Sequence, residues 1–297
     1  TVVIVGQGVR EGIEKWITVA MPFFVMLLMI LLVRNLSLPA SSEVVRFLFY
    51  PDFSKLTLSS LMQAIGHVLF TLSIGFGVMV TFGSYLRSED HIPTAGFRVS
   101  LVDMALSLTT AMAIFPIAFM ASSKSLKNPV LLFEVLPQYL AASEALRIFG
   151  VLFFCCLYMA ALNASIILLE VIVSNWKDKQ KKLKRIRITW FSGCAALLFS
   201  ILPALSSTVL KDFTWGKKSL IEILDTVLIN WILPLVALGF VWLFASGTSA
   251  SWRQKEFVDK TRFVSTVMYE YWEKSLLWLI PGLIIFAYVL QVIDLLG

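Results

Sequence analysis

The residues best suited to bind a ligand interrupt an apolar stretch. From Gln63 to Tyr85 the sequence reads QAIGHVLFTLSIGFGVMVTFGSY, with Ser73, Gly75 and Gly77 inside a segment long enough to cross a membrane as one helix. In hydrocarbon an unpaired backbone N–H or C=O group costs several kcal/mol, so non-helical backbone persists there only where it lines a cavity or binds a ligand. The pattern therefore predicts a broken helix whose free backbone groups form a binding site.

A second candidate is Asp103, which lies within the apolar run SLVDMALSLTTAMAIFP. A charge at the centre of a bilayer is costly, so an ionisable residue there is a functional hypothesis by default. The alternative is an aspartate at a helix end, exposed to the cytoplasm. Glu170 is also deep in an apolar run. Two isolated carboxylates, with no paired aspartates or Ser-Lys pair at one depth, give little support to an enzyme, so the chain is not expected to be one.

Composition indicates what kind of protein positions these residues. Hydrophobic residues make up 58% of the 297-residue chain and charged residues 15%, and the mean hydropathy is +0.84. These values are typical of an integral membrane protein. Because about 20 apolar residues cross a bilayer as a helix, we expect an all-α integral membrane fold with about seven complete transmembrane helices. The predicted spans are 14–36, 59–86, 96–121, 146–175, 188–209, 219–246 and 272–296.

The basic residues predict an orientation. Lys and Arg concentrate in the segment 176–187, where Asp178 is the one acidic residue. Because cytoplasmic loops are enriched in Lys and Arg, we expect 176–187 to be a basic cytoplasmic loop of a protein in the cytoplasmic membrane. The same rule explains the tract without nucleic acid, which is not an expected partner. The loops 39–58 and 127–144 would then be extracellular, and their apolar helical pieces fit either lids or packed surface loops.

Other chemistries find little support. Cys155, Cys156 and Cys194 lie in apolar runs, as small core residues do. The sequence contains no HExxH, CxxC, Walker loop or G-x-S-x-G elbow. A zinc enzyme, an ATPase and a serine hydrolase are therefore not expected. The oligomeric state leaves no trace in the sequence.

Four stretches carry a resemblance to a known family. GIEKWITVAMPFFVMLLMILLVRNLSLP, FLFYPDFSKLT and GHVLFTLSIGFGVMVTFGSYL resemble the fifth span, third outer loop and sixth span of the neurotransmitter:sodium symporter family, and ALNASIILLE resembles its eighth span. The resemblance implies a leucine-transporter-like inverted-repeat fold of the bacterial eleven-span branch. On this alignment residues 1–297 form a single membrane domain that begins within the fourth span. An N-terminally truncated chain, holding about half of its binding site, is therefore expected.

The resemblance implies a substrate pocket around the break. The matching positions are Phe70, Thr71, Ser73, Phe76, Gly77, Ala164 and Leu168. Phe70 and Phe76 would form apolar walls, while Ser73 and Gly77 would supply unwound backbone that faces the ligand. Two phenylalanines at helical spacing are by themselves typical of a core. The adjoining S-x-G-x-G pattern favours the pocket.

The resemblance also implies sodium sites. The matching ligands are Thr71 and Asp103 in the first site, and Ala160 and Asn163 in the second. Hydroxyl and carbonyl oxygens suit a hard cation. At the second site, however, Ala164 stands where relatives carry a hydroxyl, so this site is expected to be weakened, rebuilt through Ser165, or lost.

The residues of the first sodium site indicate whether transport requires chloride. Ser107, one helical turn after Asp103, occupies the position where some chloride-independent relatives place a glutamate. In this chain the carboxylate has moved to Asp103. Sodium ions are therefore the expected cofactors, and chloride is not expected to be required.

Two gates follow from the same matching. Asp225 matches an acid of the extracellular gate, and His67 replaces a glutamine common in that network. Tyr85 and Asp178 match the cytoplasmic gate, although Asp178 also fits an ordinary surface charge in a lysine-rich loop.

The function implied by the resemblance is sodium-coupled symport of a neutral, hydrophobic amino acid by alternating access. The expected partners are that amino acid and the lipid bilayer. Two alternatives stay open. One is a non-transporting C-terminal fragment of such a symporter, and the more remote one is a membrane-embedded enzyme.

Overall fold

The part of the chain that the computed structural model describes is all helical, as predicted. The described residues are 1–87, 90–121, 137, 140–141, 144–206, 220–258 and 266–296. The predicted lid 127–144 lies mostly outside them. The chain divides into two compact units: unit 1 is Thr1–Phe53 with Val102–Gly193, and unit 2 is Ser54–Leu101 with Cys194–Gly297.

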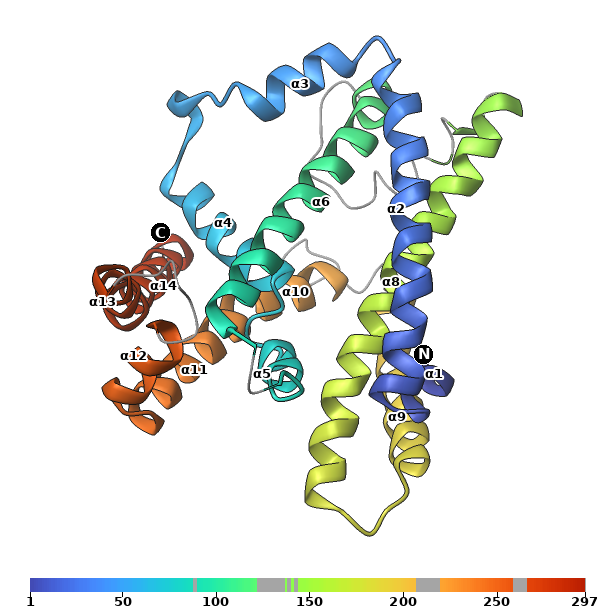
Figure 1. Ribbon diagram of the computed structural model, residues 1–297. Coiled ribbons are helices and arrows are strands. Elements are labelled where there is room, and N and C mark those ends of the chain that lie inside the picture. Colours follow the sequence, from blue (N-terminus) through green and yellow to red (C-terminus); the bar gives the residue numbers. More distant parts are fainter. Residues whose placement is uncertain are drawn as a thin grey trace. The chain divides into compact units, whose positions relative to one another are not determined.

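Unit 1 is built on long helices near the two ends of its sequence. Its elements are α1 (Val2–Gly6), the π-helical turn η1 (Val9–Glu14), α2 (Lys15–Leu36), α3 (Ser41–Phe49), most of α6 (Ile92–Ala121), α8 (Glu144–Lys179) and the start of α9 (Arg185–Leu205). The helices α2 and α8 run side by side, and α1 lies beside the start of α9 (Figure 1).

Two clusters of buried side chains hold unit 1 together. The first joins α2, α6 and α8 and contains Leu27, Leu28, Leu31, Ala113, Ile117, Leu140, Phe153 and Cys156. The second joins α1, η1, α8 and α9 and contains Val5, Ile13, Ile166, Leu169, Val173 and Ile188. In a bilayer both lipid and protein interior are apolar, so helices associate through close packing and hydrogen bonds. Large exposed side chains of this unit, such as Val19 at 71% exposure, suit a surface in contact with lipid.

The predicted outer loop 39–58 contains the short helix α3 and a 3-10 turn, η2 (Phe53–Lys55). Val44 on α3 is buried. The ring of Phe47 makes edge contacts with Phe115 and Phe119 of α6, with centroids 6.1 and 5.9 Å apart. The helical piece expected in this loop is therefore present, and it packs against α6.

Unit 2 contains the interrupted helix. Its elements are α4 (Leu58–Thr71), α5 (Val78–Gly83), the start of α6, the end of α9, α10 (Leu220–Val227), the π-helical turn η4 (Leu228–Ile232), α11 (Leu233–Gly247), α12 (Ala250–Val258), α13 (Thr266–Lys274), the π-helical turn η5 (Ser275–Leu279) and α14 (Ile280–Leu296). Buried Leu69, Ala237 and Ile284 join α4, α11 and α14. The end of α4 thus packs into the core of this unit through Leu69.

Six helical stretches of the described residues are long and apolar enough to cross a membrane. They are Val9–Leu36, Ile92–Met120, Arg147–Lys179, Arg185–Leu205, Leu220–Gly247 and Val267–Leu290. Each corresponds to one of the predicted spans. The remaining predicted span, 59–86, is divided between α4 and α5 and so forms no continuous helix.

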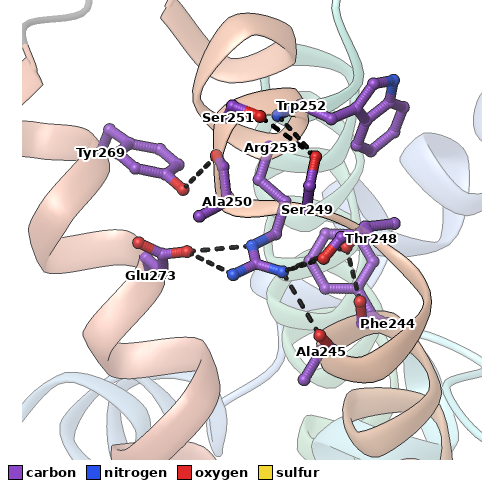
Figure 2. Close-up of polar contacts among 10 residues, drawn as sticks. All are labelled: Phe244, Ala245, Thr248, Ser249, Ala250, Ser251, Trp252, Arg253, Tyr269 and Glu273. Carbon is purple, nitrogen blue, oxygen red and sulfur yellow. Dashed lines mark hydrogen bonds and ion pairs between the residues drawn. The ribbon is translucent and has the colours of Figure 1, made fainter.

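A polar cluster joins the helices that follow α11 (Figure 2). Arg253 of α12 is only 8% exposed, and its Nε and Nη2 atoms donate to Glu273 Oε1 at 2.9 and 2.8 Å. Its Nη1 donates to the Thr248 carbonyl at 2.7 Å. The hydrogen bonds to Glu273 raise the pKa of Arg253, so the guanidinium stays charged. One arginine therefore ties the end of α11 to α12 and α13.

Replacing Glu273 with Gln should destabilise unit 2. The variant keeps an acceptor oxygen for the two hydrogen bonds but removes the charge that balances Arg253, so these bonds become weaker, at a cost of about 1–1.5 kcal/mol. Thermal unfolding of the purified protein in detergent measures the change. The matched control is Glu270→Gln, because Glu270 is exposed on the same helix. Equal midpoints for the two variants would contradict a stabilising role for the cluster.

Candidate functional site

The helix predicted over 59–86 is interrupted between α4 and α5. The helix α4 begins at a capping box, in which the Thr57 hydroxyl accepts from the Ser60 N–H at 3.2 Å and the Ser60 side chain accepts from the Thr57 N–H. It ends at Thr71, and α5 starts again at Val78. Figure 1 shows the two as separate coils. The predicted interruption of this span is confirmed.

The end of α4 closes in a specific way. The Ser73 N–H donates to the Phe70 carbonyl at 3.0 Å, and the Ile74 N–H donates to the Leu69 carbonyl at 2.8 Å. This is a Schellman motif, which places Ser73 in the left-handed position that glycine usually occupies. Its φ is +54°, and no other non-glycine residue of the described chain has a positive φ. A serine held in this conformation is strained, and such strain collects at ligand sites.

The residues after the motif leave backbone groups free. Gly75 and Gly77 have φ values of +96° and +77°. In the described part of the chain, the N–H groups of Gly75, Phe76 and Gly77 donate to no backbone carbonyl. These donors lie beside the start of α5, where the helix dipole also favours negative charge. The segment is therefore suited to receive a carboxylate.

Aromatic side chains flank these free donors. The rings of Phe70 and Phe76 meet edge to face, with centroids 6.0 Å apart and planes at 71°. The structure thus brings two of the predicted pocket residues together across the break. Thr71 is half-buried, and its hydroxyl donates to the Val68 carbonyl at 3.3 Å, which leaves the oxygen lone pairs able to accept or to coordinate.

The predicted residues of α8 lie in unit 1 and share a face of that helix. Ala160, Ala164 and Leu168 follow one another at intervals of four residues, and all three are exposed. Such spacing puts small and apolar side chains in one stripe. Asn163 lies to the side of this stripe, half-buried, where α8 contacts α2.

The Asn163 amide is bound to α2. Its Oδ1 accepts from the Trp16 indole at 3.0 Å, and its Nδ2 contacts the Met21 sulfur at 3.6 Å. The Ser165 hydroxyl donates to the Leu162 carbonyl at 2.8 Å and also bonds to the Thr1 hydroxyl at 2.8 Å. The sequence indicated no partner for these two polar side chains.

The remaining predicted residues lie as follows. Asp103 of α6 belongs to unit 1 and is half-buried, with Ser107 exposed one turn later, whereas Thr71 belongs to unit 2. The predicted gate residues are all exposed: His67, Tyr85, Asp178 and Asp225. Tyr85 packs its ring edge to face against Phe82 at 5.9 Å.

One buried ion pair was not foreseen. Glu170 on α8 is fully buried and pairs with Arg185, the first residue of α9. Arg185 also donates through Nε to the Val5 carbonyl at 3.0 Å, so the pair joins α1, α8 and α9. Glu170 was recognisable as a carboxylate in an apolar run. Nothing in the sequence distinguished its partner, Arg185, from the other basic residues of 176–187.

Substituting Gly75 with Ala should damage the break. A Cβ there would lie 3.0 Å from the Leu233 carbonyl oxygen, and the φ of +96° disfavours any L side chain. The two effects should cost about 2 kcal/mol or more of stability and reduce ligand binding. The control is Gly239→Ala, because Gly239 lies within α11 and a Cβ there meets nothing within 4 Å. If both variants unfold at the wild-type temperature, the close approach of Leu233 does not constrain Gly75.

The chain is similar to known membrane transporters. The chain matches the sodium:neurotransmitter symporter family over residues 1–296. It is 36% identical over 242 residues to the uncharacterized sodium-dependent transporter YhdH of Bacillus subtilis (strain 168). The aligned region covers 80% of this chain and 52% of YhdH. The chain is 29% identical over 225 residues to a sodium-dependent dopamine transporter of Caenorhabditis elegans, covering 69% of this chain and 36% of the relative.

A solved structure is similar over almost the whole chain. The crystal structure of MhsT in complex with L-phenylalanine superposes with a TM-score of 0.84 and 29% identity, covering 97% of this chain and 65% of MhsT. The chain spans about half the length of the Bacillus relative that it matches. The match agrees with the all-helical membrane fold and with the expectation that the chain is not an enzyme. From the interrupted helix, the order of the spans and these matches, the chain belongs to the sodium:neurotransmitter symporter family.

Proposed function

We propose that this chain belongs to a sodium-coupled symporter that carries a neutral, hydrophobic amino acid across the cytoplasmic membrane by alternating access. The observation that carries the proposal is the break after α4. There the free N–H groups of Gly75–Gly77 lie next to the paired rings of Phe70 and Phe76. Backbone donors suit the carboxylate of an amino acid, and the rings suit an apolar side chain.

The similarity to MhsT supports the same substrate class. MhsT was crystallised with L-phenylalanine. In this chain the exposed stripe of α8 would add Ala164 and Leu168 as further apolar walls. Burying an unpaired substrate charge against such walls costs several kcal/mol, so a neutral side chain is favoured.

Thr71 and Asp103 would be ligands of the first sodium site. A hydroxyl oxygen and a carboxylate are both ligands that a hard cation prefers. The relatives YhdH and the dopamine transporter are named sodium-dependent, which supports sodium as the coupled ion. The sodium gradient would then drive uptake, with His67 and Asp225 at an outer gate and Tyr85 and Asp178 at an inner one. In this orientation the basic loop 176–187 faces the cytoplasm.

Uptake into liposomes tests the function. The protein produced from its gene is reconstituted, and radiolabelled phenylalanine is offered with an inward gradient of sodium or, in the control, of potassium. Accumulation with sodium alone is expected. Equal accumulation with both ions, or none with either, would refute a sodium-coupled symporter.

Competition defines the substrate class. Unlabelled leucine and phenylalanine should displace the labelled substrate, whereas lysine and glutamate should fail, because their charges would be buried without a partner. A difference of at least tenfold in the concentration for half inhibition corresponds to about 1.4 kcal/mol. Should lysine or glutamate compete better than leucine, Phe70 and Phe76 do not line the pocket.

Asp103 predicts independence from chloride. A sodium ion beside a zwitterion leaves a net positive charge in a medium of low polarity, which a fixed carboxylate offsets. Wild-type uptake should therefore continue when gluconate replaces chloride. Asp103→Asn keeps an oxygen ligand but removes the charge, so it should weaken sodium binding or make uptake depend on chloride.

The matched control is Ser107→Ala, because Ser107 lies one turn further along α6 and carries no charge. It removes no charge and should keep the chloride independence. A wild type that stops in gluconate, or an Asp103→Asn variant with unaltered sodium and chloride dependence, would contradict the role of this carboxylate.

A further inference from the structure

The connection between α8 and α9 holds the positive charge that the sequence concentrates in 176–187. Seven of these residues are basic, and only Asp178 is acidic. One of the lysines shapes the connection, because the Nζ of Lys177 donates to the carbonyl oxygens of Lys181 at 3.0 Å and Leu183 at 2.7 Å. These bonds fold the connection back onto the end of α8. The neighbouring basic residues are therefore held close together in a short turn.

One further basic residue of the connection is used inside the protein, since Arg185 pairs with the buried Glu170. Five others are exposed and make no side-chain hydrogen bond or ion pair with the residues that the structure describes. This basic cluster consists of Lys179, Lys181, Lys182, Lys184 and Arg187. Asp178 is the one carboxylate in the same segment. The like charges of the cluster therefore repel one another unless an anion binds among them.

The basic cluster lies where lipid headgroups are expected. The helix α9 begins at Arg185 and has 21 residues. At 1.5 Å per residue it is about 31 Å long, which matches a hydrocarbon core of about 30 Å, so its first turn lies at the edge of that core. Trp190 and Phe191 follow on the next turn and are exposed, and the Phe191 ring stacks on that of Trp176 with centroids 5.5 Å apart. Tryptophan is enriched at this level of a membrane.

We propose that the basic cluster binds the phosphate groups of anionic phospholipids in the leaflet that this end of α8 and α9 faces. Lys and Arg donate charge-assisted hydrogen bonds to phosphate oxygens, and groups of about four to eight such residues beside a membrane span attract anionic lipids. The neighbours of the cluster favour a lipid over a free phosphate ion, because exposed Leu183, Ile186 and Trp190 offer apolar surface to acyl chains. Such lipid binding is independent of the proposed symport.

Native mass spectrometry of the purified protein in neutral detergent tests this binding. Anionic phosphatidylglycerol and zwitterionic phosphatidylcholine are titrated in separate arms. Phosphatidylglycerol should bind more tightly by about tenfold or more, because each lysine near a membrane surface contributes about fivefold. The variant Lys181→Gln/Lys182→Gln/Lys184→Gln should lose this preference and bind phosphatidylcholine as the wild type does. Replacing the other two members, as Lys179→Gln/Arg187→Gln, should also weaken the binding of phosphatidylglycerol.

The matched control removes the same charge elsewhere. Lys55→Gln/Lys255→Gln/Lys274→Gln replaces three exposed lysines of unit 2 and should keep the preference for phosphatidylglycerol. An equal loss in both triple variants would show attraction to net charge alone, which overturns the site. Equal affinities of the wild type for the two lipids would overturn it as well. Without lipid, all variants should unfold at the wild-type temperature, because the replaced side chains are exposed.

Soluble anions decide between a lipid and a free phosphate. Inorganic phosphate and glycerophosphoglycerol, which is the headgroup without acyl chains, are added in excess to the complex with phosphatidylglycerol. Neither should displace the lipid, because neither can cover the apolar surface beside the cluster. Displacement by either anion would assign the cluster to a soluble phosphate and would refute lipid binding.

Discussion

A backbone N–H or C=O group without a partner in hydrocarbon costs several kcal/mol, and the segment Leu72–Gly77 satisfies only part of this demand within the protein. The Schellman motif pairs the donors of Ser73 and Ile74 with α4, whereas those of Gly75–Gly77 find no backbone partner among the residues that the structure describes. Helices of unit 2 pack against this segment and against the end of α4. The start of α11 reaches it so closely that a Cβ at position 75 would lie 3.0 Å from the Leu233 carbonyl oxygen. Leu69, one turn before the break, is buried against α11 and α14.

In unit 1, neighbouring residues of α8 have two different surroundings. The stripe of Ala160, Ala164 and Leu168 is exposed, as the wall of a substrate site requires. The adjoining Asn163 faces α2 and bonds to Trp16. Hydrogen bonds between membrane helices contribute about 0.6–2 kcal/mol each, enough to fix how two helices meet. The stripe is therefore held by its neighbour on the same turn, and by the buried pair of Glu170 and Arg185 further along α8.

The sequence predicted the elements better than their partners. Apolar runs about 20 residues long identified each of the six long apolar helices of the described chain, since length and hydropathy are local properties. The break was predictable because Gly75 and Gly77 adopt backbone conformations that other residues avoid. The left-handed conformation of Ser73 gave no such signal. The pairing of Trp16 with Asn163 and of Arg185 with Glu170 depends on contacts between distant segments, which no local pattern encodes. The residues of the predicted lid 127–144 lie mostly outside the described chain.

Amide hydrogen exchange at Gly75, Phe76 and Gly77 tests most directly whether the backbone donors at the break receive the substrate. Exchange is followed by mass spectrometry in lipid nanodiscs, with phenylalanine in sodium and with phenylalanine in potassium. The proposed site predicts fast exchange in potassium and marked protection in sodium, while the amides of α4 change little. Amides that are equally protected in both salts, or equally unprotected, would contradict the claim.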